Sequence, residues 1–520
     1  MVSTEERVRP DAPAADRSVR GTPFNTIVTC VAALIGPALY LVFIDHYAVN
    51  SFFGDDWSVA PLVHQALHGQ LSLSQLWRQY NESRLFMGNS VDVLFGHLDR
   101  FNLRAVVFFS AALFITSYAL LLGLLHRYLG SRLTPIPVLV VGAVWFSWAD
   151  VQNSLWAFQL SWYLTVLFLT LMMFALLVPR HHRVAWFTVA VLAAVAGSLS
   201  TVQGFTLWPL GAIAILWPGG WWLRRDPSRP RGPRVTEIVT WATVTVGTIA
   251  LYLPGYNFHD NGCLSGCTPG VALRHPVTVT KFFFALIGNV VPGGVLFFPS
   301  VHNYGRFELV GVVLFAAAVF IVVQSWRLRD GEERLPLPLL LIGFSLSFDV
   351  TIALGRGGTG PAGAVAGNRY VMPNLILLTA IIIFAWKHRP TLRSPARNTI
   401  PRLALVVLAI FLIVQVKESV GFGRANGAVV RSAWTASARY FVNSDRLPAQ
   451  DRACYQGQAL FFQAGALPSF ASRLHMAESD GLGEFEPNAY RYFRRLGPPP
   501  DLFGGCSKAP SAGGSSAART

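Results

Sequence analysis

The chain has 520 residues, of which 52% are hydrophobic and only 13% are charged. Soluble domains carry roughly 25% charged residues, so this composition excludes an ordinary soluble protein. The formal net charge of +15 does not indicate nucleic-acid binding, because Arg and Lys lie mostly in short loops between apolar runs. We therefore expect a membrane protein without a nucleic-acid partner.

The N-terminal segment is polar and precedes the first apolar run. Residues 1–24 contain Pro10, Pro13 and charges of both signs, a composition that predicts a disordered cytoplasmic tail. This segment is too long and too acidic for the start of a signal peptide. The first apolar run is therefore predicted to be a retained span.

Apolar runs recur along the chain as far as residue 416. A span needs about 20 apolar residues. The runs cover residues 26–44, 105–125, 136–149, 157–178, 184–199, 205–223, 235–253, 309–326, 337–354, 371–386 and 403–416. One more stretch, 277–298, is interrupted by Pro292, Gly293 and Gly294. We predict an all-α polytopic membrane protein with about 11 transmembrane helices.

The charges of the loops predict its orientation. Basic residues gather at the N-terminus and in alternate loops, near residues 127–132, 180–183, 224–234, 327–334 and 387–402, whereas the opposite short loops hold only Arg274, Arg356 and Arg369. Positive charge marks the cytoplasmic side. The N-terminus is therefore expected inside and the C-terminus outside, in the cytoplasmic membrane. This orientation requires 277–298 to be a re-entrant or interfacial segment.

The membrane domain is predicted over 25–420, with a long first extracytoplasmic loop at 46–104. Loops of this length are usually functional. The loop contains Asp55 and Asp56, adjacent carboxylates between aromatic residues, which repel each other unless a proton or a cation compensates them. They could supply a catalytic base or bind Mg²⁺, Mn²⁺ or Ca²⁺. Alternatively, either one could cap the helix that begins near Trp57.

Two other charged residues follow in the same loop. Glu82 could act as a second acid, base or metal ligand, and Arg84 could contact a phosphate. The alternative is a Glu–Arg pair that ties the loop to the helix bundle. Both residues are predicted to bind substrate.

Polar residues also mark two predicted turns between spans on the outer side. These are Asp150, Gln152, Asn153, Trp156 and Gln159 at one turn and Gln203 at the next. Polar residues beside spans are functional candidates. The aromatic ones could line a sugar site or belong to the aromatic belt at the membrane interface.

The last long outer loop is rich in glycine and contains two arginines. Arg356 stands in a glycine run, and Arg369 and Tyr370 stand at the mouth of a span. Glycine lets backbone N–H groups approach an anion, and arginine can clamp a lipid phosphate bidentately. Arg369 could equally extend to ordinary lipid headgroups. We predict that Arg356, Arg369 and Tyr370 bind substrate.

The remaining chain is predicted to form a small extracytoplasmic C-terminal domain over 421–506, followed by a disordered tail at 507–520. Cys263, Cys267, Cys454 and Cys506 all fall in segments assigned to the outer side. Disulfides persist in oxidising compartments. We predict the pairs Cys263–Cys267 and Cys454–Cys506, with free thiols or a metal site as the alternatives.

The acidic pair just after the first span resembles the GT-C superfamily of integral membrane glycosyltransferases. The resemblance covers topology over most of the chain, but sequence only around Asp55–Trp57. It implies a polyprenyl-phosphate-linked sugar as donor, a hydroxyl acceptor on glycan, lipid or protein, and catalysis on the outer face, with inversion expected. It also implies that Asp55 or Asp56 is the base and, more weakly, that Arg369 contacts the donor phosphate.

Two other functions remain open from the sequence. A transporter or flippase for a lipid-linked saccharide would place polar residues at mid-membrane, and Asp349 is the best candidate for that role. A non-enzymatic assembly factor would leave the acidic pair unexplained. The glycosyltransferase is the preferred hypothesis.

Overall fold

The computed structural model describes residues 23–130, 133–178, 182–217, 235–258, 269–293, 304–328, 335–366, 368–392, 399–448, 452, 454–455 and 470–499. Within these ranges the chain is almost entirely helical, and its one sheet is a two-residue hairpin of β1 (Gln79–Tyr80) and β2 (Ser83–Arg84). The predicted disordered tail at 507–520 and nearly all of the N-terminal one lie outside the described residues.

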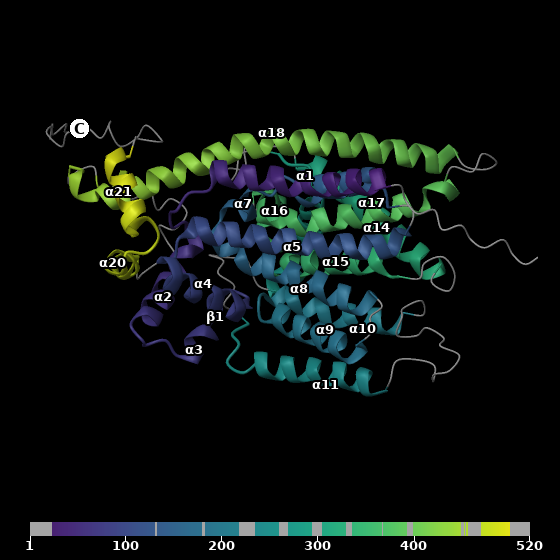
Figure 1. Cartoon of the computed structure of the whole chain (residues 1–520), viewed down its shortest axis with the longest axis horizontal. Helices are drawn as coiled ribbons and strands as arrows, with labels where there is room; N and C mark the ends of the chain where they lie inside the picture. The colour runs from purple at the N-terminus through teal and green to yellow at the C-terminus, as the bar shows by residue number, and fades with distance from the viewer. Residues whose placement is uncertain are drawn as a thin grey trace, which may run out of the picture.

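The helices form an elongated bundle (Figure 1). In the described part, eight are long and apolar enough to cross a membrane. They are α1 (Pro23–Tyr47), α5 (Leu103–Leu129), α8 (Leu160–Leu177), α11 (Val235–Tyr252), α14 (Gly305–Leu328), α15 (Leu337–Arg356), α17 (Val371–Leu392) and α18 (Thr399–Asn443). Four shorter apolar helices complete the bundle: α6 (Pro135–Trp145), α9 (Arg183–Ser198), α10 (Leu207–Leu216) and α13 (Pro276–Gly288). The protein is an all-α polytopic membrane protein, as predicted.

Each apolar run in the sequence corresponds to one of these helices, and α13 corresponds to the interrupted stretch 277–298. α13 is 13 residues long, or about 20 Å, which is shorter than the roughly 30 Å hydrocarbon core of a bilayer. It packs antiparallel to α14, because Gly288 lies against Phe307 and Gly311 against Phe284. Residues 294–298 lie outside the described ranges, and the number of crossings and their orientation stay predictions.

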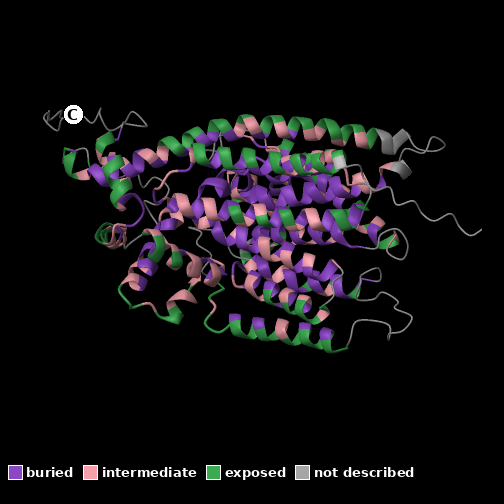
Figure 2. Ribbon diagram, in the orientation of Figure 1, coloured by how far each residue is buried: buried purple, intermediate pink, exposed green. Residues whose placement is uncertain are grey.

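Close backbone contacts hold the spans together. Lipid is as apolar as a leucine side chain, so helices in a bilayer associate through tight packing rather than through burial from water. At the contact of α1 with α6, a Cβ on Gly36 would lie 3.0 Å from the carbonyl oxygen of Gly142. Figure 2 shows buried residues concentrated inside the bundle, whereas α11 and α18 expose much of their surface at its two edges.

Shorter elements gather where the chain leaves the spans. Residues 46–104 form η1 (Gly54–Ser58), α2 (Ala60–Leu67), α3 (Leu73–Leu76), the β1–β2 hairpin and α4 (Phe86–Asp99). These elements and the C-terminal segment lie together at one end of the bundle (Figure 1), which we call the loop end. The other short elements are α7 (Val151–Leu155), η3 (Ala157–Gln159), η4 (Val202–Thr206), α12 (Pro269–Arg274), η6 (Gly357–Thr359), α16 (Gly360–Ala366) and η7 (Asn368–Tyr370).

The C-terminal segment begins without a break from the last span. α18 is continuous over 45 residues, so the predicted domain boundary at 420–421 falls inside a single helix. Beyond it come η8 (Ser444–Arg446), α20 (Phe470–Asp480), η9 (Gly483–Phe485) and α21 (Pro487–Leu496).

This segment docks on the first long loop. The side chain of Asn50 donates to the carbonyl of Gly483 at 2.9 Å, and the amide of Phe52 donates to the Glu484 carboxylate at 2.9 Å. Trp57 packs against Phe52, Phe441 and Phe470, with ring centroids 4.5, 5.3 and 5.0 Å away. The C-terminal segment therefore contacts the loop both before Asp55, at Asn50 and Phe52, and after it, at Trp57.

Glu484 makes the stability of this docking depend on pH. Burial raises the pKa of its carboxyl to about 8, so between roughly pH 4.5 and 8 the folded state holds a proton that the unfolded chain has released. Stability therefore falls as pH rises through this window. We expect Glu484→Gln to remove the contribution of this carboxyl to the pH dependence of the free energy of unfolding. That contribution is at most about 1.4 kcal/mol per pH unit.

Thermal unfolding of the detergent-solubilised protein between pH 4.5 and 8.5 measures this effect. The matched control is Glu418→Gln, which changes an exposed glutamate on α18. A Glu484→Gln protein whose midpoint changes with pH as steeply as the wild-type midpoint would refute the prediction.

Candidate active site

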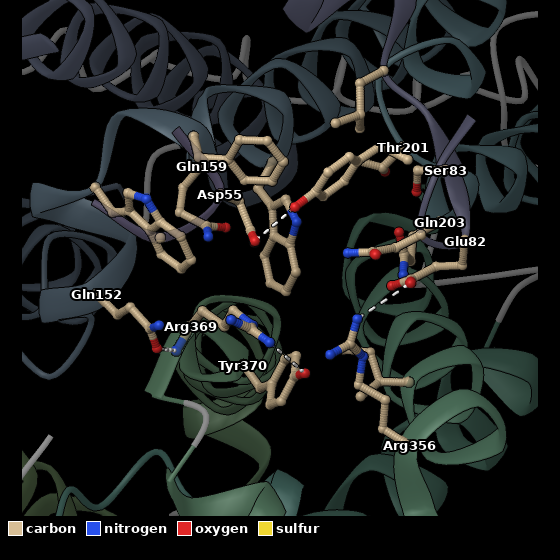
Figure 3. Close-up of a pocket in the computed structure, with 18 of the residues that line it drawn as sticks. Asp55, Glu82, Ser83, Gln152, Gln159, Thr201, Gln203, Arg356, Arg369 and Tyr370 are labelled. Carbon is tan, nitrogen blue, oxygen red and sulfur yellow. Dashed lines mark hydrogen bonds and ion pairs between the residues drawn. The ribbon is translucent and has the colours of Figure 1, made fainter. Parts of the chain in front are cut away.

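A cavity of about 630 Å³ opens among the elements of the loop end. Its walls come from η1, the β1–β2 hairpin, the turn between α7 and α8, η4, the α15–α16 connection, η7 and α20. Figure 3 shows carboxylates, amides and guanidinium groups from these elements directed toward one open centre. Segments that are distant in sequence therefore contribute to a single site.

Asp55 lines this cavity at the start of η1. The hydroxyl of Tyr80 donates to its Oδ1 at 2.7 Å. Burial and the neighbouring carboxylate of Asp55 raise the pKa of Tyr80 above its ordinary value, so this hydroxyl remains a donor at neutral pH. The side chain faces the cavity (Figure 3), so its other carboxylate oxygen can accept a proton from a bound molecule.

The backbone before Asp55 permits this orientation. Gly54 has a φ of +58°, a conformation that L side chains rarely adopt. A Cβ there would lie 2.7 Å from the ring of Trp156. The indole of Trp156 also donates to the carbonyl of Phe53 at 2.9 Å. Glycine and tryptophan together fix the turn that presents Asp55.

Asp56 has a different role from its neighbour. It is 1% exposed, and its two carboxylate oxygens accept from the amides of Phe53 and Phe158 at 3.1 and 2.8 Å. Burial raises the pKa of this carboxyl, and the two amide donors partly oppose that effect. Asp56 does not line the cavity. Asp56 is the third residue of η1 and accepts from the amide that precedes this turn, so it does not cap a helix that begins near Trp57, and its catalytic or metal-binding role stays a prediction.

Arg84 is also a structural residue. Its guanidinium donates to the carbonyls of Trp77, Tyr252 and Pro254 at 2.8, 2.9 and 2.6 Å, and the residue is 4% exposed. It lies outside the cavity lining. The structure places its donors on backbone carbonyls, where they fasten the hairpin to the end of α11, and its predicted contact with a substrate phosphate stays untested. Glu82 does not pair with it.

Glu82 pairs instead with Arg356, and both line the cavity. Oε2 of Glu82 lies 3.2 Å from Nη2 of Arg356. The Arg356 side chain is 19% exposed and the Glu82 side chain 37%, so water and ligands can reach the pair. The pair joins the β1–β2 hairpin to the end of α15, which are far apart in sequence.

Arg369 and Tyr370 line the adjacent wall. The backbone amide of Arg369 donates to the side-chain oxygen of Gln152 at 3.0 Å, and its guanidinium donates to the hydroxyl of Tyr370 at 3.3 Å. The guanidinium also lies 5.9 Å from the ring centre of Trp156 and 5.2 Å from that of Tyr370. These contacts direct the positive charge toward the cavity, opposite Asp55 (Figure 3).

The polar turns predicted from the sequence contribute to the same cavity. Gln152, Trp156, Gln159 and Gln203 line it, together with the rings of Phe158 and Trp162. Asp150 and Asn153 do not, because Asn153 donates to Asp150 at 2.7 Å and to the carbonyl of Arg369 at 2.7 Å. These two residues support the wall from behind.

Sequence reasoning missed three contributions at this end of the molecule. Tyr80 was visible two residues before Glu82, but its contact with Asp55 depends on the hairpin. Arg473 of α20 lines the cavity, and no local pattern marks it. His64 and His68 form a cluster with Asp480; their i, i+4 spacing was a signal that could have been recognised.

The predicted disulfides fall mainly outside the described residues. Cys263, Cys267 and Cys506 are not described. Cys454 is disulfide-bonded, and Cys30 in the first span is a free thiol.

Asp349, the candidate for a transport role, lies apart from the cavity lining. It is fully buried on α15 and accepts from the side chain of Asn374 at 3.3 Å. This contact joins α15 to α17.

Comparisons with known proteins add one structural likeness. No family model and no curated protein matches the chain. Among solved structures, the chain is similar to the archaeal oligosaccharyltransferase AglB from Archaeoglobus fulgidus, in complex with an inhibitory peptide and a dolichol-phosphate. The identity is 14% and the TM-score 0.41, and the match covers 83% of this chain and 59% of that chain. The present chain thus spans less than two thirds of the AglB structure it matches.

Proposed function

We propose that this protein is a membrane glycosyltransferase of the GT-C type. It would transfer a sugar from a polyprenyl-phosphate donor to a hydroxyl on a glycan, lipid or protein, at the outer face of the cytoplasmic membrane. The observation that carries this proposal is that Asp55, Arg356 and Arg369 line one cavity beside the spans. One carboxylate that can act as a base and two positively charged guanidinium groups face the same cavity. This arrangement suits a reaction between a hydroxyl and a phosphate-bearing donor.

Asp55 is the proposed general base. As the acceptor oxygen attacks the anomeric carbon, its proton passes to the Asp55 carboxylate, and the bond from that carbon to the phosphate oxygen breaks. Polyprenyl phosphate leaves with the bonding electrons. By analogy with inverting glycosidases, a single displacement inverts the anomeric centre and requires only one base. Tyr80, which donates to Oδ1, would hold the carboxylate in position.

Arg369 and Arg356 are the proposed phosphate contacts. Negative charge grows on the leaving phosphate as the glycosidic bond breaks, and preorganised donors stabilise that charge. Arg369 is held in position by Gln152, Tyr370 and Trp156. Arg356 is paired with Glu82, so a phosphate would compete with this carboxylate for the same guanidinium.

The aromatic walls support a sugar ligand. Trp156, Phe158, Trp162 and Tyr80 line the cavity beside amides and hydroxyls. Rings of this kind stack on the C–H groups of a sugar, while the amides bind its hydroxyls. The volume of about 630 Å³ is within the range of small-molecule sites, roughly 300–1,000 Å³.

No step of the proposed reaction passes through a divalent cation. The predicted ligands of Mg²⁺, Mn²⁺ or Ca²⁺ were Asp55 and Asp56, and both oxygens of Asp56 accept from backbone amides. Among the described lining residues, the remaining carboxylates are Asp55 and Glu82, and Glu82 is paired with Arg356. Mg²⁺ is commonly held by one or two carboxylates together with substrate phosphates and water, so a cation that binds Asp55 and the donor phosphate stays a proposal.

Reconstitution in liposomes tests the proposal. The purified protein is incubated with polyprenyl-phosphate sugars and a panel of hydroxyl acceptors, and release of polyprenyl phosphate is measured together with the labelled product. We expect release that depends on the acceptor. Movement of the intact donor between leaflets without release would support the flippase alternative and would contradict the transferase.

A further inference from the structure

A second cluster of chemically reactive side chains lies outside the cavity, where the C-terminal segment meets the first long loop. Nδ1 of His64 lies 2.6 Å from Oδ2 of Asp480, and Nε2 of His68 lies 3.0 Å from Oδ1. One ligand atom from each residue lies within 4.8 Å of the others. The cluster joins α2 to the end of α20.

The helix places both imidazoles on one face. His64 and His68 are four residues apart on α2 and at its C-cap, and their ring centres are 4.5 Å apart. Two histidines at i and i+4 with a third ligand from another element are a common arrangement for zinc. The side chain of Asp480 is 7% exposed and that of His68 is 49% exposed, so the carboxylate is fixed and the site is open to solvent.

We infer that His64, His68 and Asp480 form a zinc-class metal site that fastens α20 to α2. Two imidazole nitrogens and one carboxylate oxygen are ligands that suit Zn²⁺, and the exposed side leaves a fourth position for water. The same groups are joined by hydrogen bonds between the imidazoles and the carboxylate. The inference rests on this geometry and does not depend on the proposed transferase activity.

Only a small movement is needed to admit the ion. Zinc lies about 2.0–2.2 Å from nitrogen and oxygen ligands, which gives ligand–ligand distances of roughly 3.4 Å in a tetrahedron. The observed separations of 2.6 and 3.0 Å must therefore widen by less than about 1 Å. His68 is at the exposed end of α2 and can rotate outward. Each coordinating nitrogen must give up its proton or transfer it to the other ring nitrogen.

The helix α20 connects this proposed metal site to the cavity. This helix carries Asp480 at its end and Arg473 seven residues earlier, and Arg473 lines the cavity. Phe470 at its start packs on Trp57. A metal at the cluster would therefore hold α20 on the first long loop at the end opposite this aromatic contact.

Metal titration of the full-length protein tests the inference. The protein is purified in detergent without a histidine tag and stripped with a chelator, and Zn²⁺ binding is measured by calorimetry and Co²⁺ binding by its visible absorption. We expect one equivalent to bind and Co²⁺ to show the intense absorption of a tetrahedral site. Asp480→Asn and His68→Ala should each weaken binding at least 10-fold, whereas His97→Ala, which removes an exposed histidine of α4, should not.

A second measurement needs no variant. Diethyl pyrocarbonate modifies accessible imidazoles, and mass spectrometry locates the modified residues. We expect one equivalent of Zn²⁺ to protect His64 and His68 but leave His97 reactive. Failure of the wild-type protein to bind Zn²⁺, equal binding by Asp480→Asn, or protection that does not distinguish these histidines from His97 would each overturn the inference.

Discussion

Asp55→Asn is expected to lower the rate of sugar transfer by about 100- to 10,000-fold, the range that a positioned general base contributes. The amide can still accept the hydrogen bond from Tyr80, so the turn should keep its shape. It cannot take a proton from the acceptor hydroxyl. The turnover number should therefore fall, while the KM for the donor changes little, in a reconstituted assay with a polyprenyl-phosphate sugar.

Two other aspartates, Asp45 at the end of α1 and the adjacent Asp56, serve as comparisons. Asp45→Asn changes an exposed residue that is paired with Arg104, and it should leave transfer unchanged. Asp56→Asn should instead reduce the yield of folded protein, because one of its two oxygen acceptors becomes an amide donor facing a backbone N–H. Wild-type turnover by Asp55→Asn would eliminate this carboxylate as the base.

Arg369→Gln is expected to lower kcat/KM by about 100- to 1000-fold, the loss that follows removal of one preorganised donor to a developing negative charge. Glutamine retains polar contact but carries no positive charge. Arg369→Lys should recover only part of the activity, because an ammonium group cannot form two parallel hydrogen bonds to a phosphate. Steady-state kinetics over a range of donor concentrations give the required comparison.

The matched control is Arg431→Gln. Arg431 is exposed on α18 and donates to the carbonyl of His46, away from the cavity lining. It should retain full activity at the same protein concentration. If Arg369→Gln and Arg431→Gln have the same kcat/KM, Arg369 does not contact the phosphate, and Arg356 alone would have to provide the positive charge.

The helical bundle was predictable because lipid imposes one simple requirement on the sequence. Long apolar runs must form helices when no water is present to satisfy the backbone, and every predicted run corresponds to an observed helix. The apolar stretch that contains α13 was recognisable by its interruption at Pro292, beyond the end of the helix. The continuity of α18 across residue 420 was not predicted, because the polar composition that follows suggested a new domain rather than a helix extending beyond the spans.

The site was only partly predictable, because sequence does not show which atoms a side chain meets. Asp55 and Asp56 are adjacent and chemically identical, and only the turn at Gly54 separates a carboxylate that faces the cavity from one that accepts from backbone amides. Arg84 and Arg356 were both predicted to bind substrate. In the folded protein the guanidinium of Arg84 donates to three backbone carbonyls, whereas Arg356 lines the cavity.

α18 runs as one continuous helix from the spans to the C-terminal segment at the loop end. An unbroken helix of 45 residues is about 68 Å long, so a tilt of about 5° at one end moves the other end by roughly 6 Å. At its far end the side chains of Arg439 and Asn443 donate to backbone carbonyls at the end of α21. Changes in bilayer thickness tilt spanning helices. We therefore expect such changes to move the far end of α18 and, with it, the C-terminal segment that carries Arg473.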